Sequence, residues 1–420
     1  MKFRALIVIT SLLLAFPAFG SGKGVAHIPL PADLIGTVDG TPYRILAPDN
    51  WNGTLLVFAH GFLFAPGVAL VPDTTPPATP SLQEQLLAQG YALAAVSFPS
   101  VEQLAILQTH DLTTLFNELV GLPSRTIIWG ASFGSGVTLK LIEKHPGIYD
   151  GAVANCAPTA GSPENMDSSL SFGLAYGAAF TWHDDLWGPV GDLRDDLNFM
   201  TDVFPIILSE AFPVAAHYGQ WEFIRLVMHL SPQQFWGSDA QLGQPFFLLQ
   251  MWKTTDRMVA SEVAYGGPVA GNIGMAYSLS DQEKQYLAGL GVNADNLLAY
   301  MNARTNIAPN RAARNHFDQW ASFTGRLSRP VLATHSKGDG LAFVSNDSYY
   351  AALVQGTSST DLLMPAYINK TSHCSFSAEQ YMAGVTAINN WLDTGQKPDA
   401  TLLPPSLDFD LSFVPPPWLW

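Results

Sequence analysis

A serine flanked by glycines lies in the stretch TIIWGASFGSGVTLK, where an apolar run changes into a helical pattern within a few residues. Gly130 and Gly134 let the backbone pack closely on both sides of Ser132, which takes strained dihedral angles if a strand turns there into a helix. A serine presented on such a turn is suited to nucleophilic attack on a carbonyl carbon. An incidental serine in a glycine-rich turn is the alternative explanation.

A serine hydroxyl needs a base and an orienting carboxylate, and both residue types follow later in the chain. His373 lies in INKTSHCSF, between a β-like run and a helical pattern, and we predict that it is the base. Asp339 follows a short buried run in RPVLATHSKGDG, and we assign the carboxylate to it. Asp347 is the rival, but it stands at a predicted helix start, where a capping role is expected. A purely structural role is the alternative for His373.

Attack on a carbonyl leaves negative charge on its oxygen, and backbone N–H groups usually stabilise that charge. Phe133, directly after the serine, supplies one predicted donor. The loop His60-Gly61-Phe62 follows the run TLLVFA and supplies the other, with Phe62 as the expected donor and Gly61 as its loop glycine. We expect His60 to shape this loop rather than to act as a second base.

Short β-like runs alternate with helical patterns around these residues. The β-like runs cover residues 43–47, 54–59, 91–98, 125–129, 149–155, 330–334 and 361–368, and the helical patterns cover 81–88, 111–120, 137–145 and 378–392. This alternation predicts a mostly parallel sheet covered by helices on both faces. In such sheets the chemistry takes place at the carboxyl ends of the strands, where all the candidate residues fall.

The stretch GASFG, the HGF loop, the GD loop and the order Ser132, Asp339, His373 together resemble the α/β-hydrolase superfamily. The resemblance covers residues 40–160 and 328–395. It implies an α/β-hydrolase fold and a serine hydrolase, usually of carboxylic esters. We expect no metal ion and no organic cofactor.

Residues 162–325 interrupt the alternation with helical patterns rich in aromatic residues, Pro and Gly. Members of the superfamily commonly place a cap at this point, so the resemblance implies a mainly helical lid over Ser132. An outer layer remote from the site is the alternative. The expected organisation is a hydrolase core of residues 23–161 and 326–400, the cap, and a Pro-rich tail of residues 401–420 that packs along the body.

Residues 1–22 have the layout of a secretory signal peptide, with Lys2 and Arg4 before an apolar stretch and small residues after it. The apolar stretch is shorter than the roughly 20 residues that span a bilayer. We therefore predict cleavage, a secreted or periplasmic location and no stable membrane insertion. A membrane anchor is the alternative.

The formal net charge is -15, and only 13% of the residues are charged. An acidic protein of this kind is poorly suited to bind nucleic acid, so the expected partner is a small or oligomeric ester. Several aspartates in residues 184–196 could gather around a calcium ion, but their spacing does not match a known calcium loop. A solvated acidic helix start explains them better.

The chain has two cysteines, and export to an oxidising compartment favours a disulfide between them. Cys156 directly follows the β-like run 149–155, and Cys374 directly follows His373. Both therefore belong at the carboxyl edge of the sheet, and we predict that they are bonded. Two buried free thiols are the alternative.

The sequence as a whole predicts an exported serine carboxylesterase with a broad apolar pocket. A serine peptidase of the same fold is one alternative, because Glu164, Glu210 and Glu222 of the cap are available to hold a peptide terminus, although we expect nothing to pair them. A binding protein on a hydrolase scaffold that has lost catalysis is the other.

Overall fold

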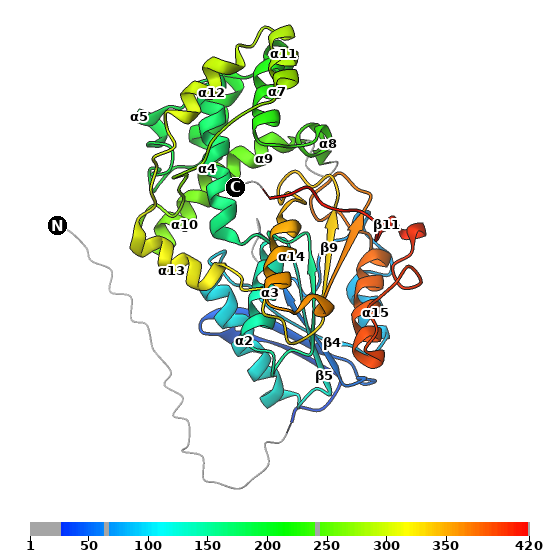
Figure 1. The fold of residues 1–420 in the computed structure, drawn as a ribbon. Helices are drawn as coiled ribbons and strands as arrows, with labels where there is room; N and C mark the ends of the chain where they lie inside the picture. Colours follow the sequence, from blue (N-terminus) through cyan, green and yellow to red (C-terminus); the bar gives the residue numbers. More distant parts are fainter. Residues whose placement is uncertain (1–26, 63–66, 240–243, 419–420) are drawn as a thin grey trace, which may run out of the picture.

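The computed structural model describes residues 27–62, 67–239 and 244–418. The predicted signal peptide, residues 1–22, lies outside these residues. In Figure 1 a sheet with helices on both sides forms one part of the molecule, and a group of helices forms the other.

A nine-stranded sheet is the centre of the first part, with the strand order β1-β2-β4-β3-β5-β6-β9-β10-β11. The strands are β1 (Ala32–Val38), β2 (Thr41–Ala47), β3 (Thr54–Ala59), β4 (Ala92–Val96), β5 (Arg125–Ala131), β6 (Gly151–Asn155), β9 (Val331–Ser336), β10 (Leu363–Ile368) and β11 (Phe409–Asp410). All neighbours from β4 to β10 pair in parallel, whereas the pairs β1–β2, β2–β4 and β10–β11 are antiparallel. The predicted fold class is confirmed: this is the α/β-hydrolase fold.

Helices cover both faces of the sheet because its central strands are apolar on both sides. Along β3, Leu55 and Val57 belong to the hydrophobic cluster of one face, and Leu56 and Phe58 belong to that of the other. The first face is covered by α2 (Glu102–Leu119), α3 (Phe133–Lys144) and α14 (Asn346–Gly356), and the second by α1 (Leu82–Ala88) and α15 (Ala378–Thr394). Two short 3-10 helices, η4 (Thr360–Leu362) and η5 (Pro405–Leu407), complete this part.

The second part is inserted between β6 and β9, and we call it the cap (Figure 1). It has its own hydrophobic cluster, in which Trp187, Trp221 and Phe247 are fully buried. Its elements are α4 (Ser162–Ala179), α5 (Asp184–Trp187), η1 (Phe199–Val203), α6 (Phe204–Glu210), η2 (Val214–His217), α7 (Tyr218–Val227), α8 (Pro232–Trp236), β7 (Ser238–Asp239), β8 (Gln244–Pro245), α9 (Phe246–Trp252), η3 (Lys253–Arg257), α10 (Met258–Tyr265), α11 (Asp281–Gly289), α12 (Ala294–Asn302) and α13 (Arg311–Ala321).

Two helices begin earlier than the sequence predicts. Helix α2 begins at Glu102, whose buried carboxylate binds Arg257 of the cap. Helix α3 begins at Phe133, directly after Ser132, although Gly134 and Gly136 lower its intrinsic helix propensity. Tertiary packing therefore decides both starts.

The strands at the edges of the sheet are not predicted by the sequence pattern. Strand β1 alternates between exposed and half-buried residues, so it lacks the apolar run of the central strands. Strand β11 belongs to the Pro-rich tail and pairs with Tyr367 and Ile368 of β10. The tail then continues to Trp418, whose amide donates a hydrogen bond to Ser348 Oγ at 2.9 Å.

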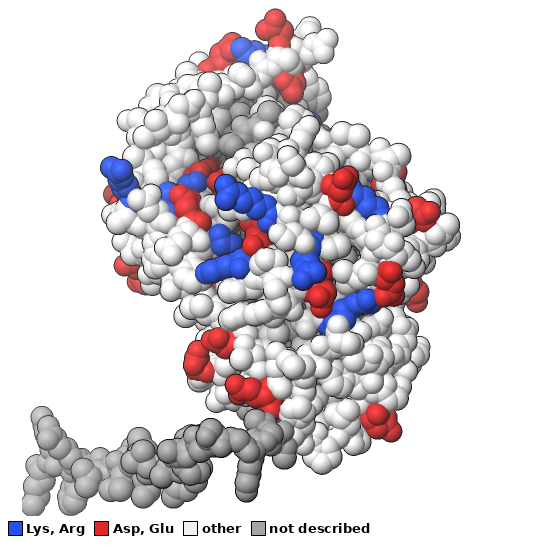
Figure 2. Space-filling view, turned by 60° about the horizontal axis from the view of Figure 1, so that its bottom comes forward, with Lys and Arg blue, Asp and Glu red and all other residues white. Residues whose placement is uncertain are grey.

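The surface of the described residues carries mixed charge. On the face drawn in Figure 2, uncharged residues predominate, and Lys and Arg side chains are interspersed with Asp and Glu. This face therefore lacks the continuous basic area on which nucleic-acid binding depends. Within the described residues no single helix is long and apolar enough to cross a membrane, and one pair, Phe199–Glu210 with Val214–Val227, passes that test only together and with a 70° bend.

Candidate functional site

Ser132 lies at the junction of β5 and α3, with φ 54° and ψ -125°, a conformation that side-chain-bearing residues rarely adopt. Its glycine neighbours make the turn possible because no side chain fits there. A Cβ atom on Gly134 would lie 2.0 Å from the carbonyl oxygen of Ala59, and one on Gly130 would lie 2.5 Å from that of Gly134. Both predicted glycines are therefore required by close backbone approach.

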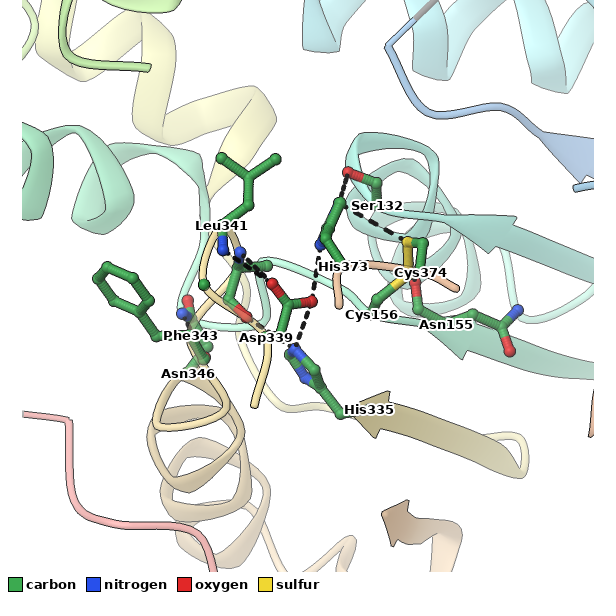
Figure 3. A network of polar contacts seen from close by, with 12 residues as sticks. Ser132, Asn155, Cys156, His335, Asp339, Leu341, Phe343, Asn346, His373 and Cys374 are labelled. Carbon is green, nitrogen blue, oxygen red and sulfur yellow. Dashed lines mark hydrogen bonds and ion pairs between the residues drawn. A yellow bond between two sulfur atoms is a disulfide. The ribbon is translucent and has the colours of Figure 1, made fainter. Parts of the chain in front are cut away.

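The three residues predicted for the reaction form one hydrogen-bonded chain (Figure 3). Ser132 Oγ lies 2.7 Å from His373 Nε2. His373 Nδ1 lies 2.7 Å from Asp339 Oδ2. Asp339 follows β9 and His373 follows β10, so the carboxyl ends of neighbouring strands deliver both residues. In this arrangement Nδ1–H donates to the carboxylate, and Nε2 accepts from the serine hydroxyl.

The carboxylate of Asp339 is fully buried and is held from several sides. Its Oδ1 accepts hydrogen bonds from the backbone amides of Leu341 and Ala342, each at 2.9 Å. Burial alone would raise the pKa of Asp339, but the charges and hydrogen bonds of His373 and His335 outweigh burial and hold the pKa well below its usual range. Asp339 is therefore ionised and can fix the imidazole orientation of His373.

His335 is a functional candidate that the sequence pattern does not reveal. Its Nε2 lies 2.8 Å from the carbonyl oxygen of Ala342, and its Nδ1 lies 3.1 Å from Asp347 Oδ2. Both partners are hydrogen-bond acceptors, so both ring nitrogens carry hydrogen and the ring is positively charged. Burial would lower the pKa of His335, but Asp347 and Asp339 outweigh it and raise the pKa to about 10. The one signal in the sequence is its place at the end of the strand that delivers Asp339.

The expectation that Asp347 caps a helix is wrong. The N-cap residue of α14 is Ser345, and Asp347 lies buried in the first turn, where it accepts a hydrogen bond from Thr159 Oγ1 at 2.7 Å. Its other partner is His335. Asp347 therefore neutralises His335, and among the described residues it makes no hydrogen bond to His373.

The two predicted oxyanion donors lie beside the serine. Phe133 is the first residue of α3, so its N–H has no partner within the helix. The amide of Phe62 donates no hydrogen bond to another described residue. A Cβ atom on Gly61 would lie 3.3 Å from Ser132 Cβ, which places this loop against the serine. The rings of Phe62 and Phe133 also contact each other, with their centroids 5.4 Å apart.

His60 shapes the loop that carries Phe62. Its ring stacks on Phe98 with a centroid distance of 3.9 Å, and its Nδ1 lies 2.5 Å from the carbonyl oxygen of Gly61. Burial lowers the pKa of His60 despite this hydrogen bond. A neutral, stacked ring agrees with a structural role.

The predicted disulfide between Cys156 and Cys374 is present, with Cα atoms 5.4 Å apart and a sequence separation of 218. It ties the residue after His373 to the residue after Asn155, whose carbonyl oxygen accepts a hydrogen bond from the Ser132 amide at 3.0 Å. Asn155 and Cys156 therefore anchor two loops: a hydrogen bond ties Asn155 to Ser132, and the disulfide ties Cys156 to the loop of His373. The sulfurs and a nitrogen of His373 lie within 4.8 Å of one another, a spacing found in metal sites, but the disulfide already engages both sulfurs.

Two cavities open onto Ser132 and His373. The larger, of about 360 Å³, is lined by Phe58, Val71, Pro72, Leu249, Cys374 and Tyr381, and we call it the large chamber. The smaller, of about 60 Å³, is lined by Phe133, Pro158, Asn165, Met166, Lys253 and Arg257, and we call it the small chamber. Phe62 and Trp252 border both, so the two chambers meet at the serine.

The cap takes part in the site, because Leu249, Trp252 and Lys253 line these chambers. The alternative of an outer layer remote from Ser132 is therefore wrong.

The glutamates considered for a peptidase are engaged elsewhere in the cap, contrary to the expectation that nothing pairs them. Glu210 binds His183 at 2.8 Å, Glu222 binds Arg225 at 2.7 Å, and Glu164 lies 3.9 Å from Arg314. None of the three lines either chamber.

Comparison with known proteins gives relatives of several kinds, although no family model matches the chain. The chain is 24% identical over 422 residues to an o-phthalyl amidase from Xanthobacter agilis, with 89% of each chain covered. Among solved structures it is similar to feruloyl esterase B from Aspergillus oryzae, with a TM-score of 0.40 and 15% identity over 86% of this chain and 80% of that one. It is also similar to an acylaminoacyl peptidase from Pyrococcus horikoshii, with a TM-score of 0.43 and 10% identity over 89% of this chain and 44% of that one.

Proposed function

We propose that the protein is a serine hydrolase that cleaves carboxylic esters through an acyl-enzyme intermediate. One observation carries the proposal: a serine on a strained strand-to-helix turn is hydrogen-bonded to a histidine, which is hydrogen-bonded to a buried, ionised aspartate. This arrangement supplies a nucleophile, a base and an orienting charge in the geometry that acyl transfer needs.

The proposed reaction begins with attack of Ser132 Oγ on the ester carbonyl while His373 takes the hydroxyl proton. The amides of Phe62 and Phe133 donate to the oxyanion, and Asp339 stabilises the imidazolium that forms. His373 then protonates the departing alcohol, which leaves Ser132 acylated. A water molecule, activated by the same histidine, releases the acid and restores the serine.

The chambers support an apolar or aromatic substrate. Phe58, Phe62 and Trp252 contribute rings to the large chamber, and its volume of about 360 Å³ suits a small molecule or one end of an ester oligomer. In this proposal the cap is a lid, because its side chains bound the space around the serine. The disulfide is compatible with a secreted or periplasmic location, to which residues 1–22 would direct the chain.

Amide hydrolysis is the second candidate. Sequence similarity to the o-phthalyl amidase extends over 89% of both chains, and the same residues can attack an amide carbonyl. A peptidase that holds a charged peptide terminus has less support, because Glu164, Glu210 and Glu222 do not line the chambers.

Labelling with a fluorophosphonate probe tests whether Ser132 is a reactive nucleophile. Assays with different substrates test which kind of bond the protein cleaves. The purified protein is expected to be labelled at Ser132, and a Ser132→Ala variant is expected to remain unlabelled. Parallel assays with 4-nitrophenyl esters, anilides and aminoacyl arylamides then separate esterase, amidase and peptidase activities. An unlabelled native protein without activity on any of the three would refute a serine hydrolase.

A further inference from the structure

The small chamber differs from the large one in the charged side chains that line it: Lys253 and Arg257 line the small chamber, and Asp73 lines the large one. Within the described residues, Lys253 and Arg257 are the two cations that line the small chamber, and no Asp or Glu lines it. Both cations come from η3 of the cap, and the remaining walls are largely apolar. Cations in an apolar cavity strongly attract an anion, because the surrounding medium screens charge poorly.

Lys253 is buried without an ion pair. Its side chain is 6% exposed, and Nζ donates a hydrogen bond to Asn165 Oδ1 at 3.3 Å and lies 5.3 Å from the ring centre of Phe343. The amide nitrogen of Asn165 donates to Gly161 and Asn346, so this amide presents its oxygen to the lysine. No carboxylate forms an ion pair with Lys253 in the part of the chain that the structure describes.

The neighbouring charges are already satisfied. Arg257 binds Glu102 and donates to Ser261 Oγ at 2.7 Å, so its charge is neutralised within the protein. Asp339 attracts Lys253 from a distance, but its oxygens are occupied by His373, His335 and two backbone amides. Burial lowers the pKa of Lys253 to about 7, against the attraction of Asp339 and together with the repulsion of Arg257. An ammonium in this environment gains most from an added anion.

Ser132 and His373 border both chambers, so His373 can protonate a leaving group in either of them. The volumes are about 360 Å³ and about 60 Å³, so only a short group fits the small chamber. We assign the small chamber to the acyl part and the large chamber to the leaving group, an assignment that matched acyl substrates test. A cavity of about 60 Å³ accommodates about four to six water-sized groups, enough for a short acyl part that ends in a carboxylate.

We propose that the small chamber binds a carboxylate on the acyl part of the substrate through Lys253, so that the preferred substrates are monoesters or monoamides of dicarboxylic acids. This inference rests on the proposed serine hydrolase function and specifies its substrate class. The carboxylate pairs with the Lys253 ammonium while the other carbonyl carbon of the same acid lies against Ser132.

Matched substrates test the inference in the native protein. Monobutyl succinate is compared with butyl butyrate, and monobutyl glutarate with butyl pentanoate, by chromatography of the acid released. Within each pair the alcohol is the same and the acyl parts differ in their second carboxylate. We expect kcat/KM for the anionic ester to exceed that of its neutral partner by about tenfold or more in at least one pair. We also expect succinate or glutarate to inhibit more strongly than butyrate or pentanoate.

Variants then assign the preference to one side chain. Lys253→Met keeps the length of the side chain without its charge, and the ratio of the two kcat/KM values is expected to fall to about one. Lys253→Arg is expected to retain part of the ratio. Lys140→Met is the control, because Lys140 binds the carbonyl oxygen of Ser322 away from both chambers. Its ratio is expected to stay at the native value.

The possible results separate the two proposals. A native protein that hydrolyses neutral esters without preferring the anionic partner in either pair overturns the carboxylate site and leaves the hydrolase proposal intact. A preference that survives in Lys253→Met also overturns it. A protein that turns over no ester or amide and does not react with fluorophosphonate refutes the hydrolase proposal, and the carboxylate site with it.

Discussion

Replacing His335 by glutamine is expected to destabilise the protein most at low pH. His335 is a buried imidazolium between Asp339 and Asp347, and glutamine keeps hydrogen-bonding groups at this position without the charge. The pKa of His335 is about 10 in the folded protein and 6.5 in the reference state. At about 1.4 kcal/mol per pKa unit, this difference corresponds to roughly 5 kcal/mol of stability. Breaking a buried charge network by removing one partner typically costs a similar 3–5 kcal/mol.

The sign of the pH dependence follows from the raised pKa. Stabilisation by the charged ring is fully present below about pH 6.5 and is lost as the pH rises through about 10. The free-energy gap between native protein and variant is therefore expected to fall from about 5 kcal/mol at pH 6 to about 3 kcal/mol at pH 8, and to nearly vanish above pH 10. For 420 residues that melt as one unit, 5 kcal/mol corresponds to about 6 °C in the thermal midpoint.

Thermal unfolding of both proteins at about pH 6, 8 and 10 measures this gap. A His316→Gln variant is the control, because His316 is exposed on α13 and its hydrogen-bond partner among the described residues is Gln103, an uncharged side chain. The free energy of unfolding of this control variant is expected to differ little from that of the native protein at every pH. A gap for His335→Gln that is equally large at pH 6 and pH 10 would show that His335 is neutral in the folded protein, and the charged ring between the two aspartates would then be refuted.

Three further outcomes are expected. Ser132→Ala and His373→Ala should each remove nearly all hydrolysis of a 4-nitrophenyl ester, and the double variant should lose little more, because the residues act as one unit; multiplicative losses would contradict this. The ratio of kcat/KM for anionic over neutral esters should decrease above about pH 7 as Lys253 loses its proton, and a ratio that is constant from about pH 6 to 9 would count against its role. Reduction of the Cys156–Cys374 disulfide should lower ester hydrolysis before circular dichroism reports unfolding, whereas simultaneous loss of both would show that the bond supports the whole fold.

The serine turn could be predicted from sequence because its geometry allows few residue types. A Cβ atom at Gly130 or Gly134 would overlap backbone atoms, so the strained turn leaves a glycine pattern that is visible in the chain. Asp339 and His373 could be placed because each follows a recognisable buried strand, and the ends of neighbouring parallel strands meet at one edge.

His335 and the role of Asp347 could not be predicted in the same way. A histidine within a short buried run has the pattern of any core residue, and Asp347 stands where an exposed cap is common. Their roles depend on Thr159 and on each other, which only the folded chain brings together. The edge strands escape prediction for a related reason, since β1 and β11 gain their structure from pairing with a neighbour rather than from an apolar pattern of their own.

Lys253 shows most clearly why chemistry is easier to predict than specificity. In the stretch QMWKTTDR a lysine looks like an ordinary solvated side chain, and nothing in its spacing marks it. It becomes a candidate for substrate recognition only because α4 and the loop after β9 enclose it beside Ser132 without supplying a carboxylate. Bond cleavage requires a strained turn at Ser132, and this turn allows few residue types beside it. Recognition of a carboxylate requires only a lysine, a common residue, at a buried position beside the serine. Distant relatives of this chain can therefore keep the serine turn and still differ in substrate through a single residue of η3.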